Sequence, residues 1–204
     1  MIAIIDYGAG NLFGVSNALK QFTEEVYITS DKEIIRSADH VILPGVGHFD
    51  DAMGSIKKSG LIETVYEVID KKTPFLGICV GLQMCFEKSQ DGSLPGLGIF
   101  PGEIKKFPVD ICKKVPQIGW NRIEYKKSPL FVDLPDDYFY FVHSYYLEAK
   151  NREEVIATSE YGIPFDCAYQ RENVFLTQFH PEKSGKTGLK LLENFVNFQA
   201  MKNE

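Results

Sequence analysis

Residues 76–86 read LGICVGLQMCF, and this stretch decides how the rest of the chain is interpreted. The apolar residues that lead into Cys79 are typical of a buried strand, and GLQMCFEK after it is typical of a helix. A Gly-x-Cys-x-Gly sequence between a strand and a helix indicates a nucleophile elbow, a sharp turn that exposes the middle side chain at the edge of a sheet. A core cysteine that lies between two glycines by chance explains the local pattern equally well.

The first half of the chain alternates strand-like and helix-like segments. Short apolar runs predict strands, and amphipathic runs predict helices between them. We expect a helix over 11–22 with Asn11 as its N-cap, and a second helical stretch over 48–72 that is broken near Gly60. The predicted strands are IAIID (2–6), VYIT (26–29), HVILPG (40–45) and PFLGI (74–78). This alternation indicates a parallel sheet that is covered on both faces.

The second half is dominated by β-branched and aromatic residues with turn residues between them. We expect strands within 97–107, 118–125, 138–149, 154–161, 165–170 and 174–182, and a closing helix over 185–201. The fold class is therefore α/β. Residues 1–204 form one domain, with a mostly parallel central sheet flanked by helices and an added antiparallel or mixed strand section.

Composition excludes several classes of function. The 204 residues carry a net charge of −6, which gives no electrostatic reason to bind nucleic acid or an anionic membrane. No apolar run approaches the roughly 20 residues of a membrane helix, and the start of the chain lacks the basic region of a signal peptide. We therefore expect a cytoplasmic protein.

Cysteine spacing and cofactor motifs are equally uninformative. Cys79, Cys85, Cys112 and Cys167 form no CxxC pair, which argues against a structural zinc site or a disulfide framework. No cluster has metal-ligand spacing, and no GxGxxG or P-loop sequence is present. We expect neither a metal nor a cofactor.

Three unusual segments follow predicted strands. They are LPGVGHF, GICVGLQ and QFHPEKSG, and the carboxyl ends of parallel strands are where open α/β sheets collect their active sites. His180 could act as a base toward Cys79, and Glu182 could orient the imidazole, as in a nucleophile–base–acid triad. The helix N-terminus after Cys79 and the backbone N–H of Val80 favour a thiolate and an oxyanion. The loop Gly45-Val46-Gly47 could turn another N–H toward that oxyanion, although such loops are usually plain turns.

These residues, in this order, resemble class I glutamine amidotransferases, whose fold is flavodoxin-like. Further stretches narrow the resemblance to the family of glutaminase subunits of imidazole glycerol phosphate synthase: IDYGAGNLFGVSNAL, LPGVGHFDDAM, GLGIFPGEIKKF, VPQIGWN and YFVHSYY. The resemblance implies that Cys79, His180 and Glu182 hydrolyse glutamine through a thioester. It also implies that the glutamine is held by Gly47, Gln83 and the backbone of His143, Ser144 and Tyr145.

The same resemblance implies a partner. A (β/α)₈-barrel cyclase subunit would form a heterodimer with this chain and receive ammonia, which it would use to make imidazole glycerol phosphate and AICAR in histidine biosynthesis. The implied interface is formed by Pro116, Gln117, Gly119, Trp120 and Asn121, with Trp120 the only tryptophan of the chain. The usual family motif carries histidine and methionine where this chain has Gln117 and Ile118. A paralogous glutaminase that serves another synthase, such as a sugar amidotransferase, stays open, as do a cysteine peptidase and, last, a non-catalytic scaffold.

Overall fold

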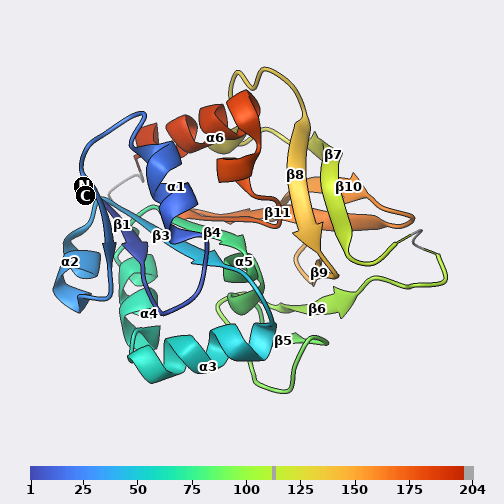
Figure 1. The fold of residues 1–204 in the computed structure, drawn as a ribbon, viewed down its shortest axis with the longest axis horizontal. Helices are drawn as coiled ribbons and strands as arrows, with labels where there is room; N and C mark the ends of the chain where they lie inside the picture. Colours follow the sequence, from blue (N-terminus) through green and yellow to red (C-terminus); the bar gives the residue numbers. More distant parts are fainter. Residues whose placement is uncertain (112–113, 200–204) are drawn as a thin grey trace.

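The computed structural model describes residues 1–111 and 114–199, so Cys112 lies outside the described residues. Its parallel half is a five-strand sheet whose neighbours run in the order β2-β1-β3-β4-β12. The strands are β2 (Val26–Thr29), β1 (Ile2–Ile5), β3 (His40–Gly45), β4 (Phe75–Cys79) and β12 (Val174–Thr177). Figure 1 shows this half beside a second half built largely of antiparallel strands.

The second half continues the same sheet. Beyond β12 the strands are antiparallel, in the order β11 (Pro164–Arg171), β10 (Val155–Glu160), β7 (Gln117–Tyr125) and β8 (Tyr138–His143). A branch adds β9 (Tyr145–Ala149), which pairs with β11 and with β6 (Gly102–Lys106), and β6 pairs with β5 (Lys88–Ser89). The expectation of a mixed section appended to a parallel sheet is confirmed.

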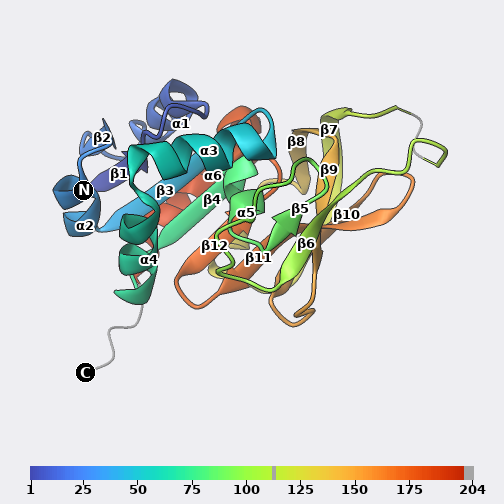
Figure 2. The same ribbon diagram turned by 90° about the horizontal axis from the view of Figure 1, so that it is seen from below.

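Helices cover both faces of the parallel half, as the two views in Figures 1 and 2 show. On one face α1 (Leu12–Leu19) packs against α6 (Gly185–Asn197). On the other, α2 (Lys32–Ser37) packs against α4 (Ile62–Asp70), and α3 (Phe49–Ser59) packs against α5 (Val80–Met84). Two short 3₁₀ helices, η1 (Pro129–Phe131) and η2 (Pro181–Lys183), complete the described elements.

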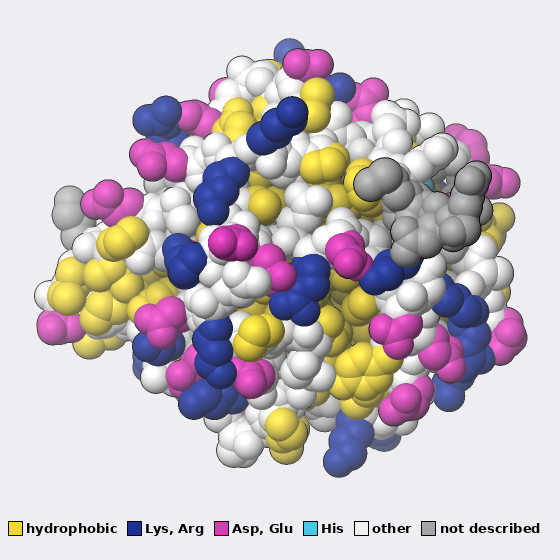
Figure 3. Space-filling view, turned by 180° about the vertical axis from the view of Figure 1, so that it is seen from behind, with side chains coloured by type: hydrophobic (Ala, Val, Ile, Leu, Met, Phe, Trp, Pro, Cys, Tyr) yellow, Lys and Arg dark blue, Asp and Glu magenta, His cyan; other side chains and the backbone are white. Residues whose placement is uncertain are grey.

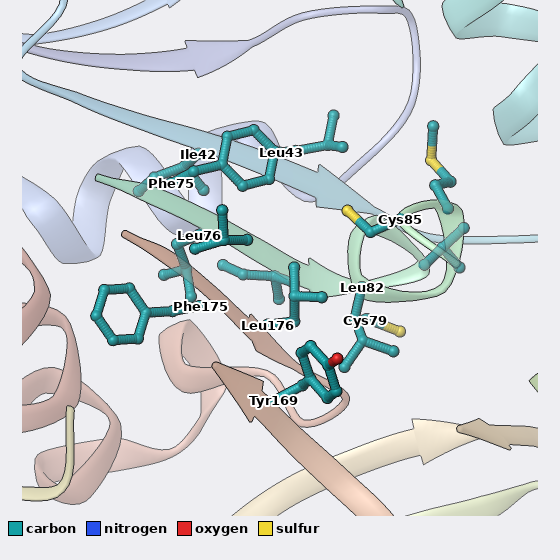
Figure 4. Packing of buried hydrophobic residues seen from close by; sticks show 14 of the residues in the cluster. Ile42, Leu43, Phe75, Leu76, Cys79, Leu82, Cys85, Tyr169, Phe175 and Leu176 are labelled. Carbon is teal, nitrogen blue, oxygen red and sulfur yellow. The ribbon is translucent and has the colours of Figure 1, made fainter. Parts of the chain in front are cut away.

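The core lies between the sheet and these helices. Every residue of β1, β4 and β12 is buried. Figure 4 shows apolar side chains of β3, β4 and β12 layered across these neighbouring strands. Burial of a large apolar side chain contributes roughly 1.5–3 kcal/mol, so this continuous layer fixes the strand ends that carry the candidate site. Acidic and basic side chains are interspersed on the face in Figure 3. No helix among the described residues is long and apolar enough to cross a membrane.

Two local expectations differ from the structure, and a third is confirmed. The first helix ends at Leu19 rather than Phe22, and the Asn11 side chain makes no cap hydrogen bond. The predicted strand over 138–149 is split at Ser144 into β8 and β9, which pair with different neighbours. The predicted break at Gly60 is confirmed, because Gly60 has the left-handed conformation (φ 71°) between α3 and α4.

Candidate active site

The three unusual segments follow β3, β4 and β12, which are adjacent and parallel, so all three lie at one edge of the sheet. Cys79 is the last residue of β4 and has φ 55° and ψ −111°, a backbone conformation that L-residues rarely adopt. The chain enters α5 immediately after it. A Cβ on Gly81 would lie 2.0 Å from the Leu43 carbonyl oxygen, so the sharp turn requires glycine there. In Figure 4 Cys79 lies at the end of β4 beside α5.

His180 and Glu182 follow β12 and lie beside the elbow. The Nδ1 of His180 is 2.9 Å from the Oε1 of Glu182, and both side chains are buried. Backbone hydrogen bonding fixes this segment, because the His180 N–H donates to the Tyr140 carbonyl at 3.0 Å. The Nε2 of His180 has no hydrogen-bond partner among the described residues, and the imidazole interacts electrostatically with Cys79 and Glu182.

The electrostatics of this trio favour a charged imidazole. Burial alone would lower the pKa of His180, but its interactions with Cys79 and Glu182 together outweigh burial and raise the pKa of the imidazole well above its usual range. Burial alone would raise the pKa of Glu182, but the hydrogen bond and charge of His180, together with the hydrogen bond from Asn11, outweigh burial and lower that pKa. Cys79, His180 and Glu182 are therefore arranged as a nucleophile, a base and an orienting acid.

Asn11 is a member of this site that the sequence did not reveal. Its Nδ2 donates to the Oε1 of Glu182 at 3.0 Å, so one carboxylate oxygen accepts hydrogen bonds from both Asn11 and His180. Asn11 is the N-cap residue of α1, as predicted, but its side chain makes no cap hydrogen bond, because its amide donates to Glu182 instead. The loop after β1 reaches the site because β1 is the parallel neighbour of β3.

A cavity of about 610 Å³ opens beside Cys79 and His180. Most of the residues that the sequence assigned to glutamine binding line this cavity, together with other residues from the strand ends. The predicted residues in its lining are Val46, Gly47, Cys79, Val80, Gln83, His143, Ser144, Tyr145 and His180. Gly45 is not among the lining residues, but it lies opposite Cys79 in the β3–β4 register. Gly47 has φ 90°, a backbone conformation that favours glycine.

Asp91 is the second residue that the sequence did not reveal. It lines the cavity with a side chain only 6% exposed, and it accepts the Phe49 backbone N–H at 2.8 Å. Burial and a hydrogen bond to Asp91 raise the pKa of Tyr145, another lining residue. A buried carboxylate beside a cavity can pair with a cationic group of a ligand.

Gln83 and His143 form the inner wall of the cavity. Gln83 is buried, and its Nε2 donates to the Oε1 of Gln178 at 3.0 Å and to the Tyr145 carbonyl at 3.4 Å. The Nδ1 of His143 lies 2.7 Å from that same carbonyl, and its Nε2 lies 3.0 Å from the Oε1 of Gln117. Burial lowers the pKa of His143 to about 4, so the ring is neutral at neutral pH and is a wall rather than a second base.

The residues predicted at a partner interface differ in their exposure and contacts. Gln117 is only 2% exposed, with its side chain enclosed within this chain, and Pro116 lines the cavity. The Asn121 amide donates to the Glu160 carbonyl at 2.8 Å. Trp120 is 55% exposed, and the neighbouring Gly119 has φ 133°.

Comparison with known proteins identifies the family of this chain. The family model described as "Glutamine amidotransferase class-I" matches residues 3–198. The chain is 46% identical to "Imidazole glycerol phosphate synthase subunit HisH 1" of Methanococcus maripaludis, covering 96% of this chain and 98% of the relative. It is 47% identical to "Imidazole glycerol phosphate synthase subunit HisH" of Moorella thermoacetica, covering 95% and 93%.

The fold has solved counterparts as well. The structure of PurLQS from Thermotoga maritima superposes with a TM-score of 0.75 at 16% identity, over 96% of this chain and 97% of that one. At that identity the likeness speaks for the fold alone, whereas the matches to the HisH subunits extend over nearly the whole sequence. The chain therefore belongs to the class-I glutamine amidotransferase family and, within it, to the HisH subunits of imidazole glycerol phosphate synthase.

Proposed function

We propose that this chain hydrolyses glutamine at Cys79 and supplies the ammonia to the synthase subunit with which it assembles in histidine biosynthesis. The observation that carries the proposal is the buried alignment of Cys79, His180 and Glu182 beside a cavity of about 610 Å³. Membership of the HisH family supplies the reaction and the pathway.

In the proposed mechanism the Cys79 sulfur attacks the side-chain amide carbon of glutamine. The C–N bond breaks, His180 gives its proton to the leaving nitrogen, and ammonia departs from a γ-glutamyl thioester. His180 then takes a proton from water, which attacks the thioester carbon and releases glutamate and the thiol. Glu182 keeps the imidazole oriented through its 2.9 Å contact to Nδ1.

The cavity lining supports roles for the remaining residues. The Val80 N–H and the loop Gly45-Val46-Gly47 would stabilise the oxyanion that forms on the amide oxygen. The Asp91 carboxylate would pair with the α-ammonium group of glutamine, and the free Oε1 of Gln83 would accept a further hydrogen bond from it. The backbone of residues 143–145, at the bend between β8 and β9, would line the α-carboxylate end.

Ammonia chemistry argues for a partner that takes the product directly. Free ammonia is protonated in neutral water and then ceases to be a nucleophile, so transfer inside a complex preserves its reactivity. We assign the receiving subunit a (β/α)₈-barrel fold, with Trp120 and its neighbours on β7 at the interface. The sugar-amidating paralogue and the peptidase lose support, because the relatives at 46% and 47% identity are HisH subunits.

The test is Cys79→Ala in the assembled synthase. Glutamine-dependent synthesis should fall by at least about 10⁴-fold because no thioester can form, while synthesis from added ammonium salt should stay within about twofold of the wild type. Both rates are measured on the same preparation. Normal glutamine-dependent turnover by the variant would disprove the nucleophile assignment, and loss of the ammonia-dependent rate would indicate a disrupted complex.

A further inference from the structure

A buried side chain that the proposed mechanism leaves unused touches the nucleophile. Gln178 follows β12 directly, is fully buried, and its Nε2 lies 3.6 Å from the Cys79 sulfur. Its backbone is fixed, because the Gln178 N–H donates to the Cys167 carbonyl at 2.8 Å. An amide with no access to solvent must find its hydrogen bonds inside the protein.

The orientation of this amide follows from its neighbours. The Tyr145 carbonyl can only accept hydrogen bonds, so the Gln83 group that faces it at 3.4 Å is the NH₂. The same Gln83 NH₂ donates to Gln178 at 3.0 Å, so Gln178 presents its oxygen to Gln83. The remaining end of Gln178, the NH₂, therefore faces the sulfur. The Tyr145 backbone carbonyl therefore determines which end of each amide donates in this series of hydrogen bonds.

The first link of this chain is itself held in place. His143 Nδ1 lies 2.7 Å from the same Tyr145 carbonyl, and its pKa of about 4 keeps it a neutral donor there. Exchanging the ends of the Gln83 amide would set two acceptors against each other at Tyr145, and exchanging the ends of Gln178 would set two donors against each other at Gln83. The last group in this network, the Gln178 NH₂, points a donor at the Cys79 sulfur, the attacking atom.

We propose that Gln178 is a further working residue of the glutaminase site: its amide donates to the Cys79 thiolate, stabilises the negative sulfur and fixes its direction, and is itself held by Gln83. The inference rests on the proposed function, since it concerns the same nucleophile. A hydrogen bond to a charged group contributes about 1.5–3 kcal/mol, which corresponds to roughly one to two pH units in the titration of the acceptor.

The test measures the rate of alkylation by iodoacetamide against pH in the free subunit, in a Cys112→Ser background. Cys85 and Cys167 are fully buried, so the reading reports Cys79. Gln178→Met removes the donor, and the pH at which alkylation reaches half its maximum should rise by about one unit or more. Gln178→Glu keeps the shape but places a carboxylate beside the sulfur, and the rise should be larger. Gln170→Met is the control: it makes the same substitution on β11, at an amide that accepts a hydrogen bond from Ser128. It should leave the pH profile of alkylation unchanged.

The relative sizes of the shifts in Gln178→Met and Gln178→Glu distinguish hydrogen bonding to the sulfur from packing. If Gln178 merely fills space, the isosteric glutamate variant should resemble the wild type and the methionine variant should be worse. That order, or an unmoved midpoint in both variants, would overturn the proposal. Should Gln178→Met fail to fold, Gln178→Glu and Gln83→Met carry the same measurement. A Cys79→Ala variant with glutaminase activity would defeat the proposed function, whereas an unmoved midpoint defeats only this inference.

Discussion

Glu182 determines which nitrogen of His180 does the chemistry. Its Oε1 accepts from His180 Nδ1 at 2.9 Å and from Asn11 Nδ2 at 3.0 Å. Because a carboxylate with a lowered pKa can only accept, Nδ1 must carry a proton, and Nε2 is the nitrogen that gives or takes the proton at sulfur. Asn11 adds a second donor to the same oxygen and so fixes the direction from which the imidazole is held.

Asp91 offers a residue-scale prediction about binding. Asp91→Asn keeps an acceptor for the Phe49 N–H but loses the charge that we assign to the α-ammonium of glutamine. The KM for glutamine should rise by about 10- to 100-fold, because a charge-assisted hydrogen bond contributes about 1.5–3 kcal/mol, while kcat should change far less. Steady-state glutaminase assays of the assembled synthase measure both.

Asp50→Asn is the matched control for that measurement. Asp50 also accepts backbone N–H groups, from Ser93 and Leu94, but it is not among the residues that line the cavity. Its substitution should leave the KM within about twofold of the wild type. An unchanged KM in Asp91→Asn would remove Asp91 from the substrate site.

At the scale of elements, the turn from β4 into α5 carries backbone strain at the nucleophile. Cys79 has φ 55° and ψ −111°, and such a conformation costs a non-glycine residue about 1–3 kcal/mol. Glycine tolerates it but usually loses about 0.5–1 kcal/mol to alanine through the entropy of the unfolded chain. Cys79→Gly should therefore be more stable than Cys79→Ala by about 1 kcal/mol, measured as the free energy of unfolding in urea.

Lys57 on α3 provides the reference pair, because it is exposed and lies in an ordinary helix. There the alanine variant should be the more stable one by about 0.5–1 kcal/mol. The opposite signs at the two positions are the diagnostic result. If alanine is the more stable residue at Cys79 as well, the turn stores no strain.

The element scale also explains what the sequence could predict. The triad was accessible because each of its segments follows an apolar strand, and parallel strands bring their carboxyl ends to one edge. The same rule applied to the loop after β1 would have brought Asn11 to the site, but its resemblance to an N-cap concealed the second role. Asp91 follows the two-residue strand β5, which has no periodicity to recognise. The bend at Ser144 lies in a stretch rich in aromatic residues with no turn signal, and only the pairing of β8 and β9 with different strands reveals it.

At the scale of the whole molecule, one face of the β7–β8 pair joins the cavity to the surface. Ile118 and Trp120 alternate with the buried Gln117, and they lie opposite Val142 and Tyr140 in the register. Val142 lines the cavity, whereas Ile118 and Trp120 are 57% and 55% exposed. An exposed apolar face that continues into the site is where a subunit receiving ammonia would bind.

Trp120→Ala should weaken association with the synthase subunit by about 2 kcal/mol, which is a roughly 30-fold rise in Kd. The reason is that an exposed aromatic side chain contributes to binding when it becomes buried at the centre of an interface. Titration calorimetry of the two purified subunits measures the Kd. Tyr27→Ala is the control, since Tyr27 is 48% exposed on β2 at the opposite edge of the sheet. At saturating partner the Trp120 variant should regain most of its glutaminase activity, because Trp120 is not among the residues that line the cavity. Equal Kd values for the Trp120 variant and the wild type would place the interface on another face. If saturating partner does not restore the glutaminase activity of the variant, Trp120 belongs to the active site itself.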